Sequence, residues 1–301
     1  MIREYFIHQA HRLKHSLSVT RPFTGRGILM KWSDKIIGSP SKPIILKTLH
    51  GFKLFIDPII DNGVERSIFY TGTYEAGTLY IFKQILSSGD VVIDVGANIG
   101  LMTLYASSRI GENGYVHAFE PEPDTFKILS QNCALNKKSN IKINKIALGR
   151  EKKTAIIYPN LDINRGSSSL VRQDNTNGKI VNVIRLDEYL HLKQLDSLKL
   201  IKIDVEGYEI EVLEGGREIF KSDRAPIICI EYSGQIASED SLAGIYDLII
   251  QMGYSIYKFS ESKGVECKLK QVNGKNEMPL HDNIFCFKKN HLSILEKIVE
   301  Q

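Results

Sequence analysis

The sequence predicts an α/β fold, in which a mostly parallel sheet carries helices on both faces and ends in a pair of antiparallel strands. The first observation is a run of β-branched residues over 90–95, followed by a glycine-bracketed turn and a helix-like segment over 101–109. The second is the alternation of strands and helices that continues from there. The third is a pair of alternating segments, 254–259 and 283–288, which predict the closing strands.

An N-terminal extension over residues 1–60 is expected before the main domain at 61–301. Its first 40 residues predict a helix followed by a loop, because the segment 21–27 breaks the apolar spacing. A hairpin that turns near His50 and Gly51 is then predicted over 44–56.

The main domain is predicted to alternate between helices and strands. Its expected elements are a helical segment over 64–86 with interruptions at Gly72 and Gly77, strand 90–95, helix 98–109, strand 115–119, helix 123–136, strand 141–145, strands 154–158 and 180–185, strand 199–204, helix 208–220, strand 226–232 and helix 238–252. The polar stretch 162–179 predicts a mobile loop over the ligand site.

Composition and cysteine usage exclude several classes of protein. A chain of 301 residues with 43% hydrophobic residues can bury the core of one elaborated α/β domain. The polar N-terminus does not resemble a signal peptide and no apolar run could span a bilayer, so we expect a cytoplasmic protein. The four cysteines lack paired metal-binding spacing, and Cys229 and Cys286 lie in apolar strands, which predicts buried free thiols.

Positive charge is concentrated near the N-terminus. Residues 1–53 contain ten Lys or Arg and two acidic residues, a net charge of +8, so the remaining chain carries −4 of the total of +4. Apolar residues at helical spacing predict a basic amphipathic helix: Ile2, Phe6, Ala10, Leu13 and Leu17. Two interpretations stay open. The helix could contact anionic lipid or a lipid-linked substrate, or it could pack on the domain or a partner subunit, which is the commoner use of such a pattern.

The turn after the strand at 90–95 predicts a site for a nucleotide-type ligand. Gly96 and Gly100 allow close approach to the backbone, and the following helix offers unpaired N–H groups. The strand at 115–119 ends at Glu120, where a carboxylate can meet ribose hydroxyls. Because Asn98 stands at the middle glycine of the G-x-G-x-x-G pattern, an NAD-dependent oxidoreductase is not favoured.

In these motifs and several later ones, the sequence resembles the FkbM family of S-adenosyl-L-methionine (SAM)-dependent methyltransferases. The resemblance covers roughly residues 65–290. The matching segments are 89–100 (GDVVIDVGANIG), 118–123 (AFEPEP), 147–149 (ALG), 185–189 (RLDEY), 201–209 (IKIDVEGYE), 212–216 (VLEGG) and 230–231 (IE). It implies a Rossmann-like class I methyltransferase sheet, which its closing antiparallel strands distinguish from the all-parallel dinucleotide fold, and SAM as the cofactor.

The resemblance also implies a set of cofactor-binding residues. These are Asp94, Gly96, Ala97, Asn98, Gly100, Glu120, Ala147 and Asp204. Asp94 would reach the methionine ammonium, Glu120 would accept hydrogen bonds from both ribose hydroxyls, and Ala147 would line the adenine pocket. The alternative for Glu120 is a surface carboxylate that caps the following helix.

Four residues are candidates for the chemistry of transfer: Asp204, Glu206, Glu231 and His281. Three acids at one edge of a sheet are costly unless they hold a cation, share a proton or bind substrate. One of them could remove a proton from a hydroxyl. Glu206 could instead cap the next helix, and His281 could be an exposed loop residue. Mg²⁺ could assist, but the sequence lacks the Asp-Asn pair of metal-dependent O-methyltransferases, so no metal is expected.

The expected function is therefore SAM-dependent methylation of a hydroxyl oxygen on a sugar, glycolipid or secondary metabolite. The alternatives are N-methylation of a small molecule and a SAM-binding module without catalysis. A small-molecule or glycan acceptor is expected as partner, and no nucleic acid, while a homodimer is a further option. Acceptor contacts are expected from the loops 159–179 and 260–283.

Overall fold

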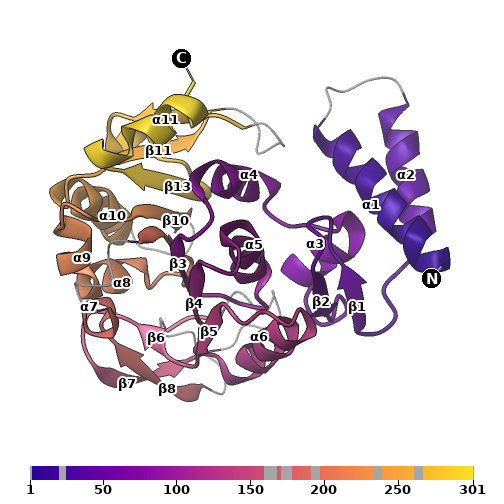
Figure 1. Cartoon of the computed structure of the whole chain (residues 1–301), viewed down its shortest axis with the longest axis horizontal. Coiled ribbons are helices and arrows are strands. Elements are labelled where there is room, and N and C mark those ends of the chain that lie inside the picture. The colour runs from indigo at the N-terminus through magenta and orange to yellow at the C-terminus, as the bar shows by residue number, and fades with distance from the viewer. Residues whose placement is uncertain are drawn as a thin grey trace.

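A computed structural model of the chain describes residues 2–19, 25–158, 168–170, 178–190, 197–233, 239–260 and 267–300. Among these residues, an eight-stranded sheet with the order β12-β11-β13-β10-β9-β3-β4-β5 forms the centre of the molecule (Figure 1). Its strands are β3 (Val91–Val95), β4 (Tyr115–Phe119), β5 (Ile141–Asn144), β9 (Leu198–Ile203), β10 (Ile227–Ser233), β11 (Ser255–Phe259), β12 (Leu269–Val272) and β13 (His281–Phe287).

The strand directions confirm the predicted class I methyltransferase sheet. β10, β9, β3, β4 and β5 pair in parallel in that order. β13 lies antiparallel between β10 and β11, which confirms the closing antiparallel arrangement. The sequence did not predict β12, which pairs with β11. It has only four residues, and its two inner residues are both exposed, so it shows no period-2 alternation.

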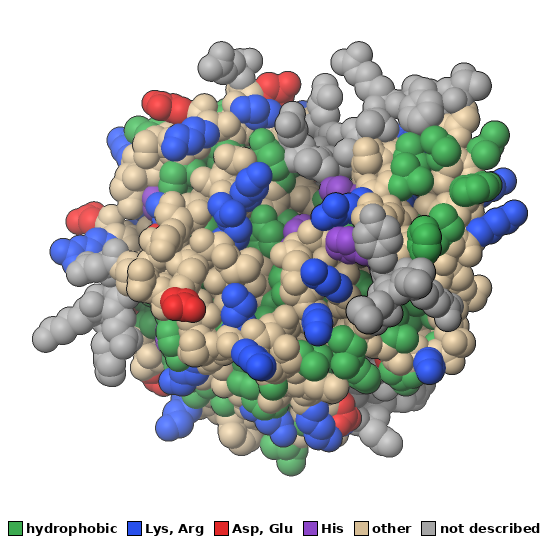
Figure 2. Space-filling view, turned by 45° about the vertical axis from the view of Figure 1, so that its right-hand side comes forward, with side chains coloured by type: hydrophobic (Ala, Val, Ile, Leu, Met, Phe, Trp, Pro, Cys, Tyr) green, Lys and Arg blue, Asp and Glu red, His purple; other side chains and the backbone are tan. Residues whose placement is uncertain are grey.

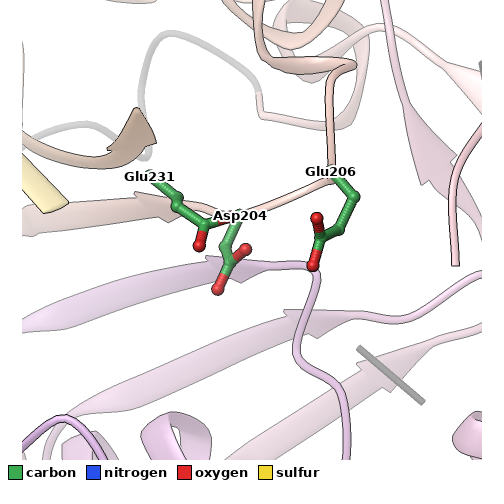
Figure 3. A group of neighbouring side chains, drawn as sticks. All are labelled: Asp204, Glu206 and Glu231. Carbon is green, nitrogen blue, oxygen red and sulfur yellow. The ribbon is translucent and has the colours of Figure 1, made fainter. Parts of the chain in front are cut away.

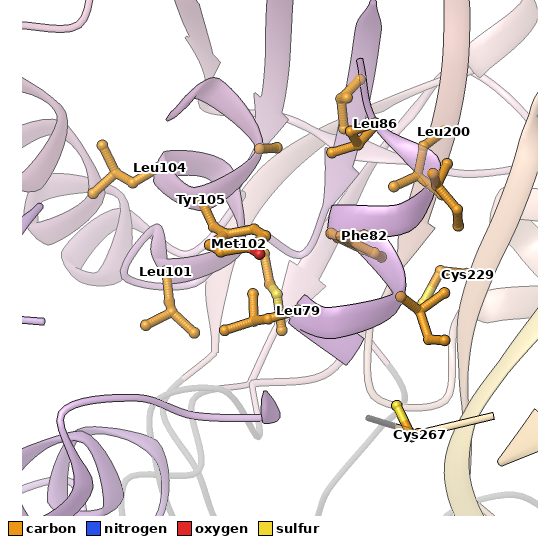
Figure 4. Packing of buried hydrophobic residues seen from close by; sticks show 14 of the residues in the cluster. Leu79, Phe82, Leu86, Leu101, Met102, Leu104, Tyr105, Leu200, Cys229 and Cys267 are labelled. Atoms are coloured by element: carbon orange, nitrogen blue, oxygen red, sulfur yellow. The ribbon is translucent and has the colours of Figure 1, made fainter. Parts of the chain in front are cut away.

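Helices cover both faces of the sheet. They are α3 (Val64–Thr71), α4 (Ala76–Ile85), α5 (Leu101–Ile110), α6 (Pro123–Leu135), α7 (Leu186–Tyr189), α8 (Glu209–Gly215), α9 (Arg217–Lys221), α10 (Glu239–Gln251) and α11 (Leu292–Ile298). Figure 4 shows side chains of α4 and α5, such as Phe82 and Met102, packed together in one core. Leu200 belongs to this core, while the next residue, Ile201, belongs to a second core with α8, α9 and α10. Successive side chains of a strand point to opposite faces, so a strand buried on both faces is apolar throughout.

Two helix predictions were wrong in detail. The segment predicted as one helix over 208–220 forms α8 and α9, which the consecutive glycines Gly215 and Gly216 separate. The predicted interruption at Gly72 is confirmed, with a φ of 72°, but Gly77 is buried inside α4. All four cysteines are buried and free, as expected.

A smaller three-stranded sheet follows β5 along the chain. It consists of β6 (Ala147–Leu148), β8 (Lys179–Ile184) and β7 (Lys153–Ile157), in that spatial order. The strands predicted near 154–158 and 180–185 are thereby confirmed. The loop predicted over 162–179 lies largely outside the described residues, and 168–170 is the part of its interior that is described.

The N-terminal extension contains two helices where the sequence predicted one. Its elements are α1 (Ile2–Val19), α2 (Arg26–Ile37) and the predicted hairpin of β1 (Ile44–Lys47) and β2 (Lys53–Ile56). The expectation of a loop after the first helix was wrong, because helix-favouring residues between Gly25 and Gly38 form α2. His11 in α1 bonds Phe69 O at 2.8 Å, so α1 packs on α3, as in the packing interpretation. No described helix is long and apolar enough to cross a membrane.

Candidate active site

The glycine-bracketed turn between β3 and α5 is packed against the protein itself. A Cβ at Gly96 would lie 1.7 Å from Asp204 O, and one at Gly100 would lie 2.7 Å from Leu129 Cδ1. Both glycines have positive φ, 79° and 94°. The close approach that the sequence assigned to a ligand is thus made by Asp204, just after β9, and by α6. α5 begins at Leu101, three residues later than predicted, with Gly100 as its N-cap.

A cavity of about 360 Å³ lies at the carboxyl ends of β3, β4, β9 and β10. This volume lies within the range of roughly 300–1,000 Å³ usual for small-molecule sites. Seven of the eight predicted cofactor residues line it: Asp94, Gly96, Ala97, Asn98, Glu120, Ala147 and Asp204. Gly100 is not in the lining. All four candidates for the chemistry of transfer are in it: Asp204, Glu206, Glu231 and His281.

The buried carboxylate of Asp94 has one oxygen that lacks a partner among the described residues. Its Oδ2 accepts a hydrogen bond from Thr103 Oγ1 at 2.6 Å, while Oδ1 is buried and unsatisfied. Asn98 Oδ1, which belongs to another cavity-lining residue, is unsatisfied as well. An unsatisfied buried acceptor costs about 1–3 kcal/mol, and an ammonium donor would remove that cost. Asp94 therefore fits the role predicted for it with the methionine ammonium of SAM.

Glu120 is oriented by two backbone amides. Its Oε2 accepts from Asn98 N and its Oε1 accepts from Glu122 N, both at 2.9 Å. Each oxygen keeps a lone pair for a further donor, as binding to two ribose hydroxyls requires. The alternative role as cap of α6 belongs to Glu122, whose Oε2 accepts from Asp124 N and Thr125 N. Burial raises the pKa of Glu120 to about 8.

Asp204, Glu206 and Glu231 form the acidic centre of the cavity. One carboxylate oxygen of each lies within 4.8 Å of those of the other two. Figure 3 shows the three side chains extending to the same side of the backbone. The cluster arises because β9 and β10 are parallel neighbours, so residues at their carboxyl ends meet. Hard oxygen ligands of this kind can hold Mg²⁺, and they can also share a proton.

The three carboxyl groups differ in their tendency to ionise. The negative charge of Asp204, with burial, raises the pKa of Glu231 to about 11. Burial would raise the pKa of Asp204, but the Lys202 ammonium, 2.7 Å from Asp204 Oδ2, outweighs it and lowers that pKa. Burial and the charge of Asp204 raise the pKa of Glu206 to about 8. Near neutral pH, Asp204 is therefore a carboxylate, Glu231 is a neutral acid and Glu206 is close to its own titration.

Glu206 is not a helix cap, as the alternative interpretation had it. It lies in the turn after β9 with a φ of 52°, which is uncommon for a residue other than glycine. α8 begins only at Glu209, whose Oε1 accepts from Val205 N at 3.2 Å and Gly207 N at 3.1 Å. Glu209 thus stabilises the turn, which leaves the Glu206 side chain in the cavity lining.

The structure adds residues for which the sequence gave no role. Lys202 is 3% exposed and pairs with Asp204. Glu75, just before α4, also lines the cavity, and its Oε2 accepts from Asn283 Nδ2 at 2.7 Å. The sequence around Glu75 carries no motif, and it is brought to the site only by tertiary packing. No pattern in the sequence could have found it.

His281 is the first residue of β13, whereas the sequence placed it on the connector before that strand. Its side chain is 54% exposed and its Nε2 lies 3.8 Å from Glu231 Oε1. Of the loops expected to contact the acceptor, most of 159–179 and the part 261–266 lie outside the described residues. Within their described parts, the cavity is lined by Ser168, Leu170 and His281.

The raised pKa values predict a pH-dependent stability of the protein without ligand. Burial raises the pKa of Glu120 and of Glu206 from 4.5 to about 8 and that of Glu209 to about 7. The folded state then binds more protons than the unfolded state between these values, so the stabilisation is full below pH 4.5 and is lost as the pH rises to about 8. Burial lowers the pKa of His50, His117 and His291 from 6.5 to about 4, and these groups act in the opposite direction below pH 6.5. We therefore expect the melting temperature to fall from about pH 6.5 to about pH 8. Glu206→Gln should flatten this slope, and the exposed Glu188→Gln controls for the lost charge. An unchanged slope in Glu206→Gln would contradict the raised pKa.

Comparison with known proteins identifies the family of this chain and several relatives. A family model described as "Methyltransferase FkbM domain" matches residues 94–256, which is more than half of the chain. "Methyltransferase 1" of Beauveria bassiana is 32% identical over 41% of this chain and 57% of that protein. "Hexuronic acid methyltransferase AglP" of Haloferax volcanii is 31% identical over 47% and 56%. "31-O-demethyl-FK506 methyltransferase FkbM" of Streptomyces tacrolimicus is 29% identical over 43% and 60%. The chain thus spans less than two thirds of each of these three relatives.

Proposed function

Because the chain belongs to the FkbM methyltransferase family, we propose that it transfers a methyl group from SAM to a hydroxyl oxygen of a sugar-like acceptor. The observation that carries this proposal is the acidic centre of Asp204, Glu206 and Glu231 beside the glycine-bracketed turn. It offers a carboxyl group that titrates near neutral pH within the cavity that also contains the cofactor residues. A hydroxyl must lose its proton as it is methylated, and such a group is suited to receive it.

In this proposal, one group of residues binds SAM and another activates the acceptor. SAM supplies an electrophilic methyl group on its sulfonium sulfur. Asp94 and Glu120 would hold its ammonium and ribose in the cavity that the acidic centre also lines. Glu206 would take the proton of the acceptor hydroxyl while the new oxygen–carbon bond forms and the sulfur–carbon bond breaks. Asp204, held ionised by Lys202, and Glu231 would orient the acceptor hydroxyls.

The proposed acceptor class has support from the chemistry of the site and from the named relatives. Carboxylate oxygens accept hydrogen bonds from several hydroxyls at once, as on a sugar ring. AglP is named as a hexuronic acid methyltransferase, and the FkbM relative is named as a 31-O-demethyl-FK506 methyltransferase. A panel of neutral sugars, uronic acids, polyols and amines, incubated with SAM, would test the proposal by mass spectrometry. Methylated hydroxyls are expected. Methylated amines alone would favour N-methylation, and SAM binding without any transfer would favour a module without catalysis.

At about pH 9, above the pKa of about 8 that burial gives Glu120, Glu120→Ala is expected to weaken SAM binding by about 1.5–3 kcal/mol, roughly 10- to 100-fold, because charged hydrogen bonds to the ribose are lost. Isothermal titration calorimetry measures this directly. Asp124→Ala provides a matched control, since its side chain is 55% exposed and lies outside the cavity lining. Unchanged SAM affinity in Glu120→Ala would refute the ribose assignment.

A further inference from the structure

The exposed face of α2 is apolar, whereas a surface helix usually exposes polar residues. α2 buries Ser33 and Ile37, while Ile28 is 68% and Trp32 is 64% exposed. Ile36, at 39% exposure, continues the same row, because residues four apart lie on one side of a helix. Leu29 beside it is also 39% exposed. We call Ile28, Leu29, Trp32 and Ile36 the α2 stripe.

Positive side chains accompany the α2 stripe. Lys31 and Lys35 on the same helix are exposed. So are three further basic residues of the extension: Arg12, Lys42 and Lys47. Among the described side chains of residues 6–53, Asp34 is the only acidic one. It is paired with Lys14. Figure 2 shows hydrophobic side chains with Lys and Arg side chains next to them on the right of the molecule, where the N-terminal helices lie.

We propose that the α2 stripe is a membrane-binding surface that lies in the headgroup region of a bilayer containing anionic lipids. An interfacial helix of this kind combines an apolar face that includes Trp with flanking Lys or Arg. The lysines complement the negative surface potential of such a bilayer. The sequence had suggested lipid contact for the first helix. In the structure, Ala10 and Leu17 of α1 are buried, so part of its apolar face packs on the protein. The exposed apolar stripe lies on α2.

A second copy of the chain is a poorer occupant of the α2 stripe. A symmetric dimer through α2 would bring together two segments that each carry +8 over residues 1–53, and such like-charge contact is unfavourable. The stripe also runs only from Ile28 to Ile36, roughly 13 Å of helix, which is short for an interface that must bury roughly 800 Å² on each partner. An anionic bilayer attracts the positive charge of this segment, and the area required of a protein–protein interface does not apply to it.

The single tryptophan of the chain makes a direct test possible, because all tryptophan fluorescence arises from Trp32. The full chain would be titrated with vesicles of phosphatidylcholine, with and without phosphatidylglycerol. With the anionic vesicles, we expect a blue shift of the emission and protection from acrylamide quenching, both reduced at high salt. No shift at low salt would overturn the proposal. So would a shift that depends on protein concentration without vesicles, since a second copy would then cover the stripe.

Variants separate this surface from the enzymatic site. Ile28→Ser with Leu29→Ser keeps the fluorescent probe and should weaken vesicle binding by about tenfold or more. Lys31→Glu with Lys35→Glu should abolish the preference for anionic vesicles. Ile180→Ser, on β8, removes an apolar side chain that is even more exposed (78%) and should bind as wild type. SAM affinity should be unchanged in all of them. Equal vesicle binding by the stripe variants and the control would contradict the proposal and leave the proposed function untouched.

Discussion

Replacing Lys202 by methionine is expected to destabilise the folded protein by about 3–5 kcal/mol, the usual result of removing one partner of a buried ion pair. Lys202 is 3% exposed and its Nζ lies 2.7 Å from Asp204 Oδ2. Burial lowers the pKa of Lys202, but the carboxylates of Asp204, Asp94 and Glu75 outweigh it, so the side chain stays charged. Methionine fills a similar volume and leaves these three carboxyl groups without that cation. Urea denaturation, followed by circular dichroism, measures the loss.

Two comparisons make this prediction specific. Lys199→Met changes a half-buried lysine of the same strand, β9, and should cost no more than about 1 kcal/mol. The cost of Lys202→Met should also be smaller near pH 5 than near pH 8, because the carboxyl groups left behind can then take up protons. Equal losses in the two lysine variants would show that Lys202 acts through packing and not through its charge.

The central strands β3, β9 and β10 could be predicted because they are buried on both faces. Each such strand is an apolar run, which stands out between polar loops. β12 lacked this signal, since it is short and half-exposed. The division of α8 from α9 at Gly215 and Gly216 was missed because an apolar helical pattern continues through both helices.

The candidate site could be predicted where it depends on the ends of strands, and not where it depends on packing between distant segments. Asp94, Glu120, Asp204 and Glu231 lie near or just after the carboxyl ends of parallel strands, so topology alone brings them to one edge. Glu75 reaches the same cavity from the connection between α3 and α4, which no local pattern indicates. The ionisation state of each acid could not be predicted from the sequence either, because it depends on burial and on Lys202. The α2 stripe was not predicted because its apolar residues were expected in a loop.

Glu206→Gln is expected to lower the rate of methyl transfer by about 10²–10⁴-fold, the range typical of a lost general base. The prediction rests on the pKa of Glu206, which burial and the charge of Asp204 raise to about 8. The carboxylate form is the active one, so kcat/KM of the wild type should rise as the pH increases through about 8. This limb should disappear in Glu206→Gln. SAM affinity, measured by calorimetry, should stay within a few-fold of wild type, since we propose Asp94 and Glu120, and not Glu206, as the residues that bind the cofactor.

Glu231→Gln is the matched control for this prediction. Asp204 raises the pKa of Glu231 to about 11, so near neutral pH the side chain is a neutral acid that an amide resembles in shape and in its ability to donate to Asp204. Glu231→Gln should therefore retain much more activity than Glu206→Gln and should keep the rise in kcat/KM near pH 8. A loss of activity that is larger in Glu231→Gln, together with an unchanged pH profile in Glu206→Gln, would transfer the role of base to the Asp204–Glu231 pair. A pH limb that survives both substitutions would point to Glu120, whose pKa burial raises to about 8 and which lines the same cavity.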